Sequence, residues 1–153
     1  MKLRKSVLDD CEKIYFLACN LENRELPFDK FQKIYREQVS NENNYCIVAE
    51  HNDEILAFLN MRFEEQLHHC ERIAEVMEFS VNPSYRSQGI GKQMFEEAVR
   101  IAKEYGCPQI ELATNRLRTD AHRFYQREGM HNFHYKFSRR LTGESFSENA
   151  IGR

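Results

Sequence analysis

The chain has 153 residues and a formal net charge of −2, with 41% hydrophobic and 30% charged residues. This length favours one domain, and the composition is that of a globular protein. The charge gives no electrostatic basis for nucleic-acid binding, and no apolar run is long enough to span a membrane. The charged N-terminus is followed by no apolar segment, so we expect no signal peptide. The five cysteines form no C-x-x-C pair, which favours reduced thiols and a cytoplasmic protein.

The N-terminal half of the chain predicts a short strand, two helices and a hairpin, in that order. Each helix has apolar residues at helical spacing after an aspartate that can cap it. Each strand of the hairpin is a compact apolar run beside a polar turn. The expected elements are a strand at 2–5, a helix opened by Asp9 or Asp10, a helix opened by Asp29 after Pro27, and strands at 45–49 and 55–63.

The C-terminal half predicts alternating strands and helices. A strand over 72–81 ends before Pro83, which cannot donate to a central ladder. The clearest helix runs from about 90 to 105, with its apolar residues on one face at a 3.6-residue period and Gly106 as its stop. The remaining expected elements are a strand at 109–114, a helix from Thr119 to Glu128 and a final strand over 131–138.

Together these elements predict an α+β fold with a central mixed, mostly antiparallel sheet flanked by helices. The order is β-α-α-β-β-β-α-β-α-β, and the segment from 75 to 114 is a βαβ crossover that makes one parallel pair. No repeat or linker interrupts the pattern. We therefore expect residues 1–141 to form a single domain and residues 142–153 to form a polar tail.

A glycine-containing loop lies between the predicted strand 72–81 and the long helix. It reads Arg86-Ser87-Gln88-Gly89-Ile90-Gly91 and is followed by Lys92. Glycines let the main chain curl so that N–H groups point inward, and the helix N-terminus adds free N–H groups and partial positive charge. Such a loop suits a pyrophosphate, although Gly-x-Gly alone also fits a plain turn. Neither a P-loop nor a Rossmann fingerprint has this spacing.

The loop resembles the Q/R-x-x-G-x-G/A signature of the GNAT acyltransferase family at every defined position. The segment from Ala121 to Met130 is similar to the family's A-x-x-F-Y-x-x-x-G-F block. The resemblance runs from Lys2 to Leu141 and implies the GNAT fold, acetyl-CoA as cosubstrate and acetyl transfer to a primary amine. It also implies that the loop binds the pyrophosphate, and that three strand residues bind the pantetheine arm. These are Phe79, Ser80 and Val81.

A closer resemblance is to aminoalkylphosphonate N-acetyltransferases, which acetylate the amine of small aminophosphonates. It rests on Leu67-His68-His69, Glu75-Val76-Met77-Glu78, Ala113-Thr114-Asn115 and the segment 120–129. The resemblance implies a small anionic amine as acceptor, with His68, His69 and Arg118 as candidates for binding it. Arg118 stands where many members of the wider family have asparagine, which adds a cation near the expected acceptor pocket.

Acetylation of an amine needs a group that removes a proton, and Glu75 and Glu78 are the two candidates. Both stand in an otherwise apolar strand, and the residues do not decide between them. Positions three apart on an ideal strand face opposite sides, but a β-bulge between them, which the resemblance implies, would turn both toward one cleft. The alternative is that one of them merely pairs with a cation such as Arg72.

Tyr125 is the candidate acid for the departing thiolate, because phenol and thiol pKa values, roughly 10 and 8.5, are close. The alternative is a core aromatic residue. Asn115 is a candidate contact to pantetheine or substrate. A divalent metal held by His68 and His69 with one of the two glutamates is a further hypothesis, against the alternative that the histidines are solvent-exposed.

Other acceptors and another class of protein remain alternatives to this reading. The acceptor could be another small amine, an aminoglycoside or a protein N-terminus. A non-catalytic acyl-CoA-binding regulatory module is the rival from a different class, although the intact glutamate and tyrosine argue against it. The expected partners are acetyl-CoA and a small amine, with no nucleic acid or membrane, and the pattern leaves a homodimer open.

Overall fold

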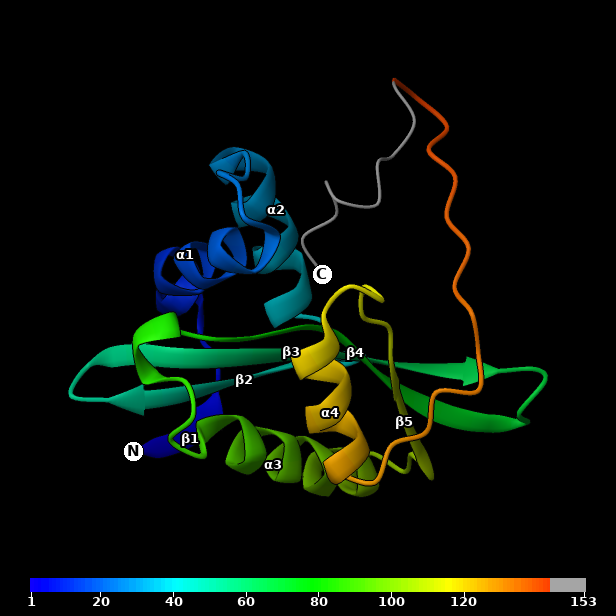
Figure 1. The fold of residues 1–153 in the computed structure, drawn as a ribbon. Coiled ribbons are helices and arrows are strands. Elements are labelled where there is room, and N and C mark those ends of the chain that lie inside the picture. The colour runs from blue at the N-terminus through cyan, green and yellow to red at the C-terminus, as the bar shows by residue number, and fades with distance from the viewer. Residues whose placement is uncertain (144–153) are drawn as a thin grey trace. The chain divides into compact units, whose positions relative to one another are not determined.

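The structure, a computed structural model, describes residues 1–143, so nearly all of the predicted tail lies outside the described residues. It consists of two compact units, residues 1–112 and the described part of residues 113–153 (Figure 1). No helix in residues 1–143 is long and apolar enough to cross a membrane. The elements are β1 (Lys2–Lys5), η1 (Leu8–Asp10), α1 (Cys11–Glu22), α2 (Phe28–Val39), β2 (Asn44–His51), β3 (Glu54–Gln66), β4 (Glu71–Val81), η2 (Pro83–Tyr85), α3 (Ile90–Glu104), β5 (Gln109–Leu112) and α4 (Thr119–Arg127).

The first unit is built on one five-stranded sheet in the order β1-β2-β3-β4-β5. The first four strands are antiparallel neighbours, and β4 pairs with β5 in parallel after the crossover through α3. The predicted mixed, mostly antiparallel sheet is therefore confirmed. Asn52 and Asp53 make the turn between β2 and β3 in the left-handed region, at φ 49° and 62°. These two residue types tolerate that region better than other non-glycine residues.

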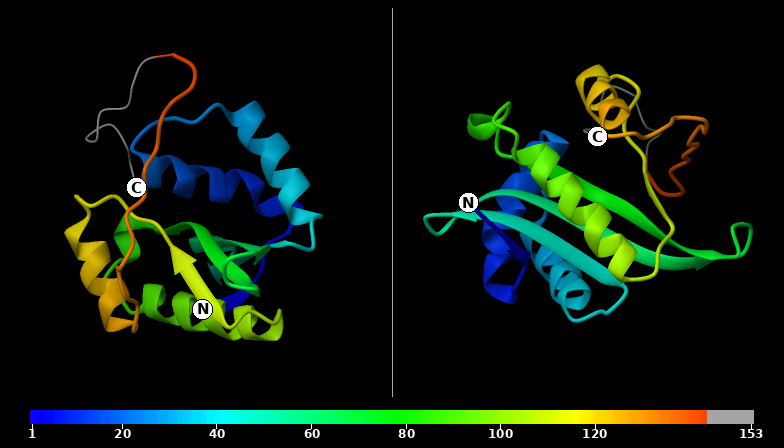
Figure 2. Two further views of the ribbon diagram at one scale, coloured as in Figure 1. Left: turned by 90° about the vertical axis from the view of Figure 1, so that its right-hand side faces the viewer. Right: turned by 90° about the horizontal axis from the view of Figure 1, so that it is seen from below.

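Helices cover both faces of this sheet (Figures 1 and 2). On one face, Met94 of α3 shares a core with Leu59 of β3. On the opposite face, which we call the α1/α2 face, Ile14 of α1 shares a core with Val48 and Phe58. Successive strand residues point to opposite sides, so neighbouring residues of β3 contribute to two separate cores.

The predicted final strand over 131–138 is wrong. Within residues 1–143, the segment after α4 contains no helix or strand. Phe133, Tyr135 and Phe137 have 81%, 92% and 92% of their surface exposed. Alternating aromatic residues favour a β conformation, but a strand also needs a partner for its backbone N–H and C=O groups. No ladder among the described residues includes this segment, so the order of elements ends at α4.

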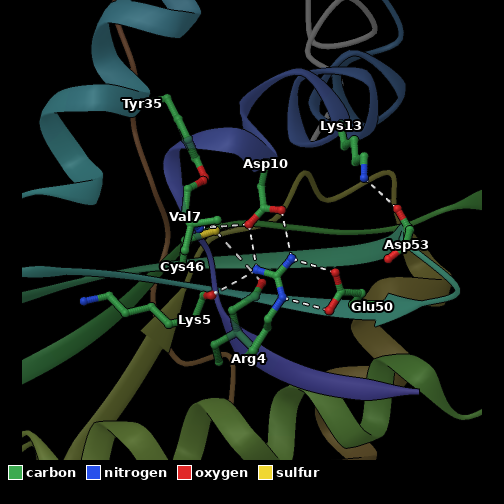
Figure 3. A network of polar contacts seen from close by, with 10 residues as sticks. Arg4, Lys5, Val7, Asp10, Lys13, Tyr35, Cys46, Glu50 and Asp53 are labelled. Carbon is green, nitrogen blue, oxygen red and sulfur yellow. Dashed lines mark hydrogen bonds and ion pairs between the residues drawn. The ribbon is translucent and has the colours of Figure 1, made fainter.

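Asp10 precedes α1, as predicted, but its carboxylate does not cap the helix. It accepts hydrogen bonds from the N–H of Val7 at 2.8 Å and from Arg4 at 2.8 and 2.9 Å, and Arg4 also binds Glu50 (Figure 3). Burial by itself would raise the pKa of Asp10, but the hydrogen bonds from Arg4 and Val7 outweigh burial and lower it. The network ties the edge of the sheet to the start of α1.

We expect Arg4→Met to lower the free energy of unfolding at neutral pH by about 3 kcal/mol, because it leaves the Asp10 carboxylate buried without its cation. The folded-state pKa of Asp10 is lowered. Its contribution to stability is therefore present above the unfolded pKa, about 3.9, and is lost as the pH falls through the folded pKa. Urea unfolding across this pH range should show that loss in the wild type and not in the variant.

The matched control for this network is Glu50→Gln, which keeps the bonds between Arg4 and Asp10. Its cost should stay below about 1 kcal/mol, because Glu50 is a partly exposed partner. Equal losses in Arg4→Met and Glu50→Gln would contradict a stabilising role for the buried pair.

Candidate active site

A β-bulge lies in the middle of β4, between the two candidate bases. Along β3, Asn60 is paired with Glu78 and the next residue, Met61, is paired with Val76. Met77 is therefore the inserted residue of the bulge. An extra residue shifts the side-chain alternation of the strand by one position. The predicted bulge between positions 75 and 78 is confirmed.

The bulge places both carboxylates on one face of the sheet. Paired residues of an antiparallel ladder project to the same side. Glu75 is paired with Arg62 and Glu78 with Asn60, and these β3 residues are two positions apart. Both glutamates consequently project to the α1/α2 face. Phe58, which lies two residues before Asn60, packs in the core of that face.

The two carboxylates have different partners. Oε2 of Glu75 accepts a hydrogen bond from Nη2 of Arg62 at 3.1 Å. Oε2 of Glu78 accepts one from Nδ2 of Asn60, a neutral amide, at 2.9 Å. Arg72, the cation that the sequence suggested, instead donates to Oδ1 of Asn43 at 3.1 Å. A guanidinium therefore contacts Glu75, and a neutral amide contacts Glu78.

The segment expected to bind pantetheine lies where the β4–β5 ladder has ended. That ladder stops at the pair of Val76 and Leu112, while β4 stays paired with β3 as far as Val81. Phe79, Ser80 and Val81 all belong to this last part of β4. Ser80 is 4% exposed. Its hydroxyl has no hydrogen-bond partner within residues 1–143, which makes it a buried polar group that a ligand could satisfy.

The loop after β4 curls tightly before α3 begins. Asn82 accepts a hydrogen bond from the N–H of Ser84 at 3.0 Å and so starts the short helix η2. Arg86 then donates from Nε to the carbonyl of Val81 at 3.3 Å. Ser87 and Gly89 both adopt positive φ angles, 61° and 80°. Position 89 favours glycine, because side chains are strained at its angle.

The helix start has the features of an anion site. The N–H of Gln93 donates to the carbonyl of Gly89 at 3.2 Å. The amides of Ile90, Gly91 and Lys92 precede this bond and therefore lie at the open end of α3. Arg86, Ser87, Gln88 and Gly89 are exposed. Amides without a helical acceptor at the positive end of a helix dipole, with Arg86 and Lys92 nearby in the chain, form a site suited to a phosphate or pyrophosphate.

The histidine pair lies in the turn between β3 and β4. The rings of His68 and His69 are 4.2 Å apart, and Nε2 of His69 is 3.3 Å from Oε1 of Glu111. This turn precedes β4, whereas the loop of residues 86–92 follows that strand. At ~3.3 Å per residue, the two ends of β4 are separated by roughly 30 Å. Within residues 1–143, no group of three or more His, Cys, Asp or Glu side chains is arranged to hold a metal ion.

The second unit contains three of the predicted site residues. Asn115 accepts the N–H of Leu117 on its side chain at 2.9 Å and the N–H of Arg118 on its carbonyl at 3.0 Å, forming the turn before α4. Arg118 is the residue before α4, so Thr119 begins the helix rather than capping it. Tyr125 packs edge-on against Phe124. Burial raises the pKa of Tyr125, and the nearby guanidinium of Arg118 acts in the opposite direction.

The fold and these motifs define a GNAT acetyltransferase, and the sequence pattern of the Acetyltransferase (GNAT) family matches residues 8–130. The chain belongs to this family and is an N-acetyltransferase with acetyl-CoA as its acetyl donor. It is 34% identical over 140 residues to an aminoalkylphosphonate N-acetyltransferase of Salmonella typhimurium, covering 92% of this chain and 91% of that protein.

Solved structures show the same fold. A protein described as a transcriptional regulator from Bacillus halodurans C-125 has a TM-score of 0.85 and 27% identity, over 92% of this chain and 99% of its own. The glucosamine-6-phosphate N-acetyltransferase of Arabidopsis thaliana has a TM-score of 0.76 and 21% identity, over 92% and 98%. The predicted GNAT fold is confirmed.

Three residues that lie beside the glutamates on the α1/α2 face were missed by the sequence analysis. Asn60 and Arg62 hold the two glutamates, and Gln38 of α2 accepts from Asn60 at 2.9 Å. A signal for Asn60 was present, because it is an amide inside the apolar run 55–63. Such a residue needs hydrogen-bond partners when it is buried. No comparable signal marked Gln38, which lies in an ordinary polar stretch of helix.

Proposed function

We propose that the acceptor of this N-acetyltransferase is the primary amine of a small aminoalkylphosphonate. The observation that carries the proposal is the similarity to a relative of that name, which spans nearly the whole of both chains. The cation at position 118 supports it, since a guanidinium can donate two parallel hydrogen bonds to phosphonate oxygens. Another small amine, an aminoglycoside or a protein N-terminus is the alternative acceptor.

Glu78 is the proposed proton acceptor. An alkylammonium has a pKa near 10, so the amine arrives protonated at neutral pH and must lose a proton before attack. Glu75 is less suited, because its carboxylate is already engaged in an ion pair with Arg62. Glu78 accepts a hydrogen bond from the amide of Asn60 on the same face, which orients its carboxylate.

Tyr125 is the proposed acid, and Asn115 a proposed contact to pantetheine or substrate. Because burial raises its pKa, Tyr125 holds its proton throughout the neutral range. Protonation of the leaving thiolate would make a phenolate, and a cation close by lowers the cost of that charge. Arg118 is the cation whose charge acts on Tyr125. We propose that Arg118 also recognises the anionic group of the acceptor.

The loop from Arg86 to Lys92 is the proposed pyrophosphate site, and Gly91→Asp tests it. A carboxylate in the first turn of α3 suits the helix itself but repels a pyrophosphate at the same amides. We expect CoA affinity to fall at least tenfold, or about 1.4 kcal/mol, by isothermal titration. Gly91→Ala is the matched control and should bind normally. Unchanged affinity in a folded Gly91→Asp protein would remove the loop from the cofactor site.

The acceptor proposal predicts a strong preference for the phosphonate. Thiol release from acetyl-CoA should give a kcat/KM for an aminoalkylphosphonate about a hundredfold above that for the uncharged alkylamine of equal length. Charge-assisted hydrogen bonds must replace the water that the dianion loses. Arg118→Ala should remove much of this preference and leave CoA binding intact. Arg140→Ala, in the same unit, is the control.

Two further arms of the assay separate the alternatives. Equal rates with both amines would refute the phosphonate proposal and leave the general N-acetyltransferase, whereas CoA binding without turnover on any amine would favour a regulatory module. A chelator tests the metal hypothesis. If the wild type loses its preference for the phosphonate when a chelator is added, and a His68→Ala/His69→Ala variant does not respond to the chelator, a metal at that turn would be supported.

A further inference from the structure

We propose that Asn60 is a positioning residue that couples helix α2 to the carboxylate of Glu78. The side-chain nitrogen of Asn60 donates two hydrogen bonds, to Oε2 of Glu78 and to Oε1 of Gln38, both at 2.9 Å. Asn60 does not act on the substrate in this proposal but works through Glu78. The inference therefore rests on the proposed function, in which Glu78 is the base.

The position of Asn60 fixes the orientation of its side-chain amide. It is 7% exposed and stands on β3 directly opposite Glu78, next to the bulge. A primary amide has two N–H groups, and here each has an acceptor. Rotating the amide by half a turn would aim its oxygen at two other oxygens, so only one orientation is stable. The carboxylate of Glu78 is thus held in a fixed direction from the neighbouring strand.

Gln38 makes this arrangement sensitive to α2. It lies in the last turn of that helix, and its carbonyl accepts the N–H of Asn41 at 3.1 Å, where the chain leaves α2. The helix covers the face that carries the two glutamates. A shift of its last turn would move Oε1 of Gln38 and release one N–H of Asn60. The hold on Glu78 would then loosen.

Several titratable or charged groups share this face with Glu78. β2 contributes Cys46, β3 contributes Arg62, β4 contributes Glu75, α1 contributes Cys11 and α2 contributes Tyr35. Burial raises the pKa of Cys46 to about 12, with a smaller contribution from the charge of Glu78, so the thiol stays neutral in the working range. Arg62 is always charged. A hydrogen bond donated to a carboxylate favours its charged form, so losing the Asn60 bond favours protonation of Glu78.

The test is the pH profile of kcat/KM for the best amine, in the full chain with acetyl-CoA saturating. Asn60→Asp keeps the shape but replaces the donor with a second carboxylate. We expect the acidic limb of the profile to shift by about one unit toward higher pH. On that limb kcat/KM falls about tenfold, and it recovers at higher pH. Gln38→Met removes the acceptor on α2 and should move the limb in the same direction by less. A merely structural role would lower activity at all pH values equally.

Matched controls are Asn43→Asp, at an exposed amide in the loop between α2 and β2, and Gln32→Met on the same helix as Gln38. Both should leave the limb in place. If the acidic limb of the pH profile stays in place in both Asn60→Asp and Gln38→Met while Glu78→Gln is inactive, the inference is overturned. The proposed base then still stands. Full activity in Glu78→Gln would instead overturn the base and the inference with it. If Asn60→Asp fails to fold, the limb in Gln38→Met decides the question alone.

Discussion

Replacing Tyr125 with phenylalanine should lower kcat by roughly 10² to 10⁴, the usual contribution of a positioned acid. The substitution keeps the ring that packs against Phe124 and deletes only the hydroxyl. The thiolate of CoA would then have to leave without a proton. Because the ring remains, the melting temperature and the affinity for CoA should be close to those of the wild type. Steady-state kinetics with saturating acetyl-CoA measure the effect.

Tyr135→Phe is the matched control, since that tyrosine is 92% exposed in the same unit. It should leave kcat unchanged. The direction of the pKa shift adds a second check. Because the pKa of Tyr125 is raised, its acid form persists above the ordinary pKa of tyrosine, and no loss of activity from this group should occur near neutrality. A Tyr125→Phe enzyme with near-normal kcat would reduce the residue to packing.

Replacing Glu78 with glutamine should also lower kcat by roughly 10² to 10⁴, because the amide cannot accept the proton of the ammonium. Glutamine has nearly the shape of glutamate and can still accept the bond from Asn60 through its carbonyl oxygen. The defect should shrink with an acceptor whose amine has a low pKa, because that amine already arrives neutral. Comparing two amines of similar size and different pKa gives this measurement.

Glu75→Gln is the control with the same chemical change on the same face. It removes the ion pair with Arg62 and should lower activity much less than Glu78→Gln. The reverse order would move the role of base to Glu75. Equal, small effects in both variants would indicate that solvent water removes the proton, and that the carboxylates serve only to balance charge.

Local pattern was sufficient for most of the elements and for the glycine-containing loop before α3. The apolar face of α3 repeats at 3.6 residues, and Gly89 is needed where the chain turns with positive φ, so both could be found without a structure. The reason is that helix periodicity and turn chemistry act between residues close in the chain. The two motifs of the family likewise lie in short, continuous segments, which made the chemistry recognisable.

Partners across strands were decided by the tertiary structure. The sequence offered a cation such as Arg72 for one of the two glutamates, but the register of β3 against β4 places Arg62 beside Glu75. One extra residue in β4 sets that register, and its location depends on pairing with β3 rather than on local propensity. The contact of Gln38 with Asn60 depends on how α2 packs over the sheet, a separation of 22 residues in the chain.

The segment after α4 shows that a local strand pattern does not predict strand pairing. Its alternating aromatic residues satisfied the period-two pattern of a strand, and the prediction of a strand over 131–138 was wrong. A helix satisfies its own hydrogen bonds, so its pattern is nearly sufficient, whereas a strand exists only where an edge is available to pair with it. The sequence by itself therefore determined the helices and the glycine-containing loop before α3. Only the tertiary structure decided that the segment after α4 stays unpaired and which residues contact Glu75 and Glu78.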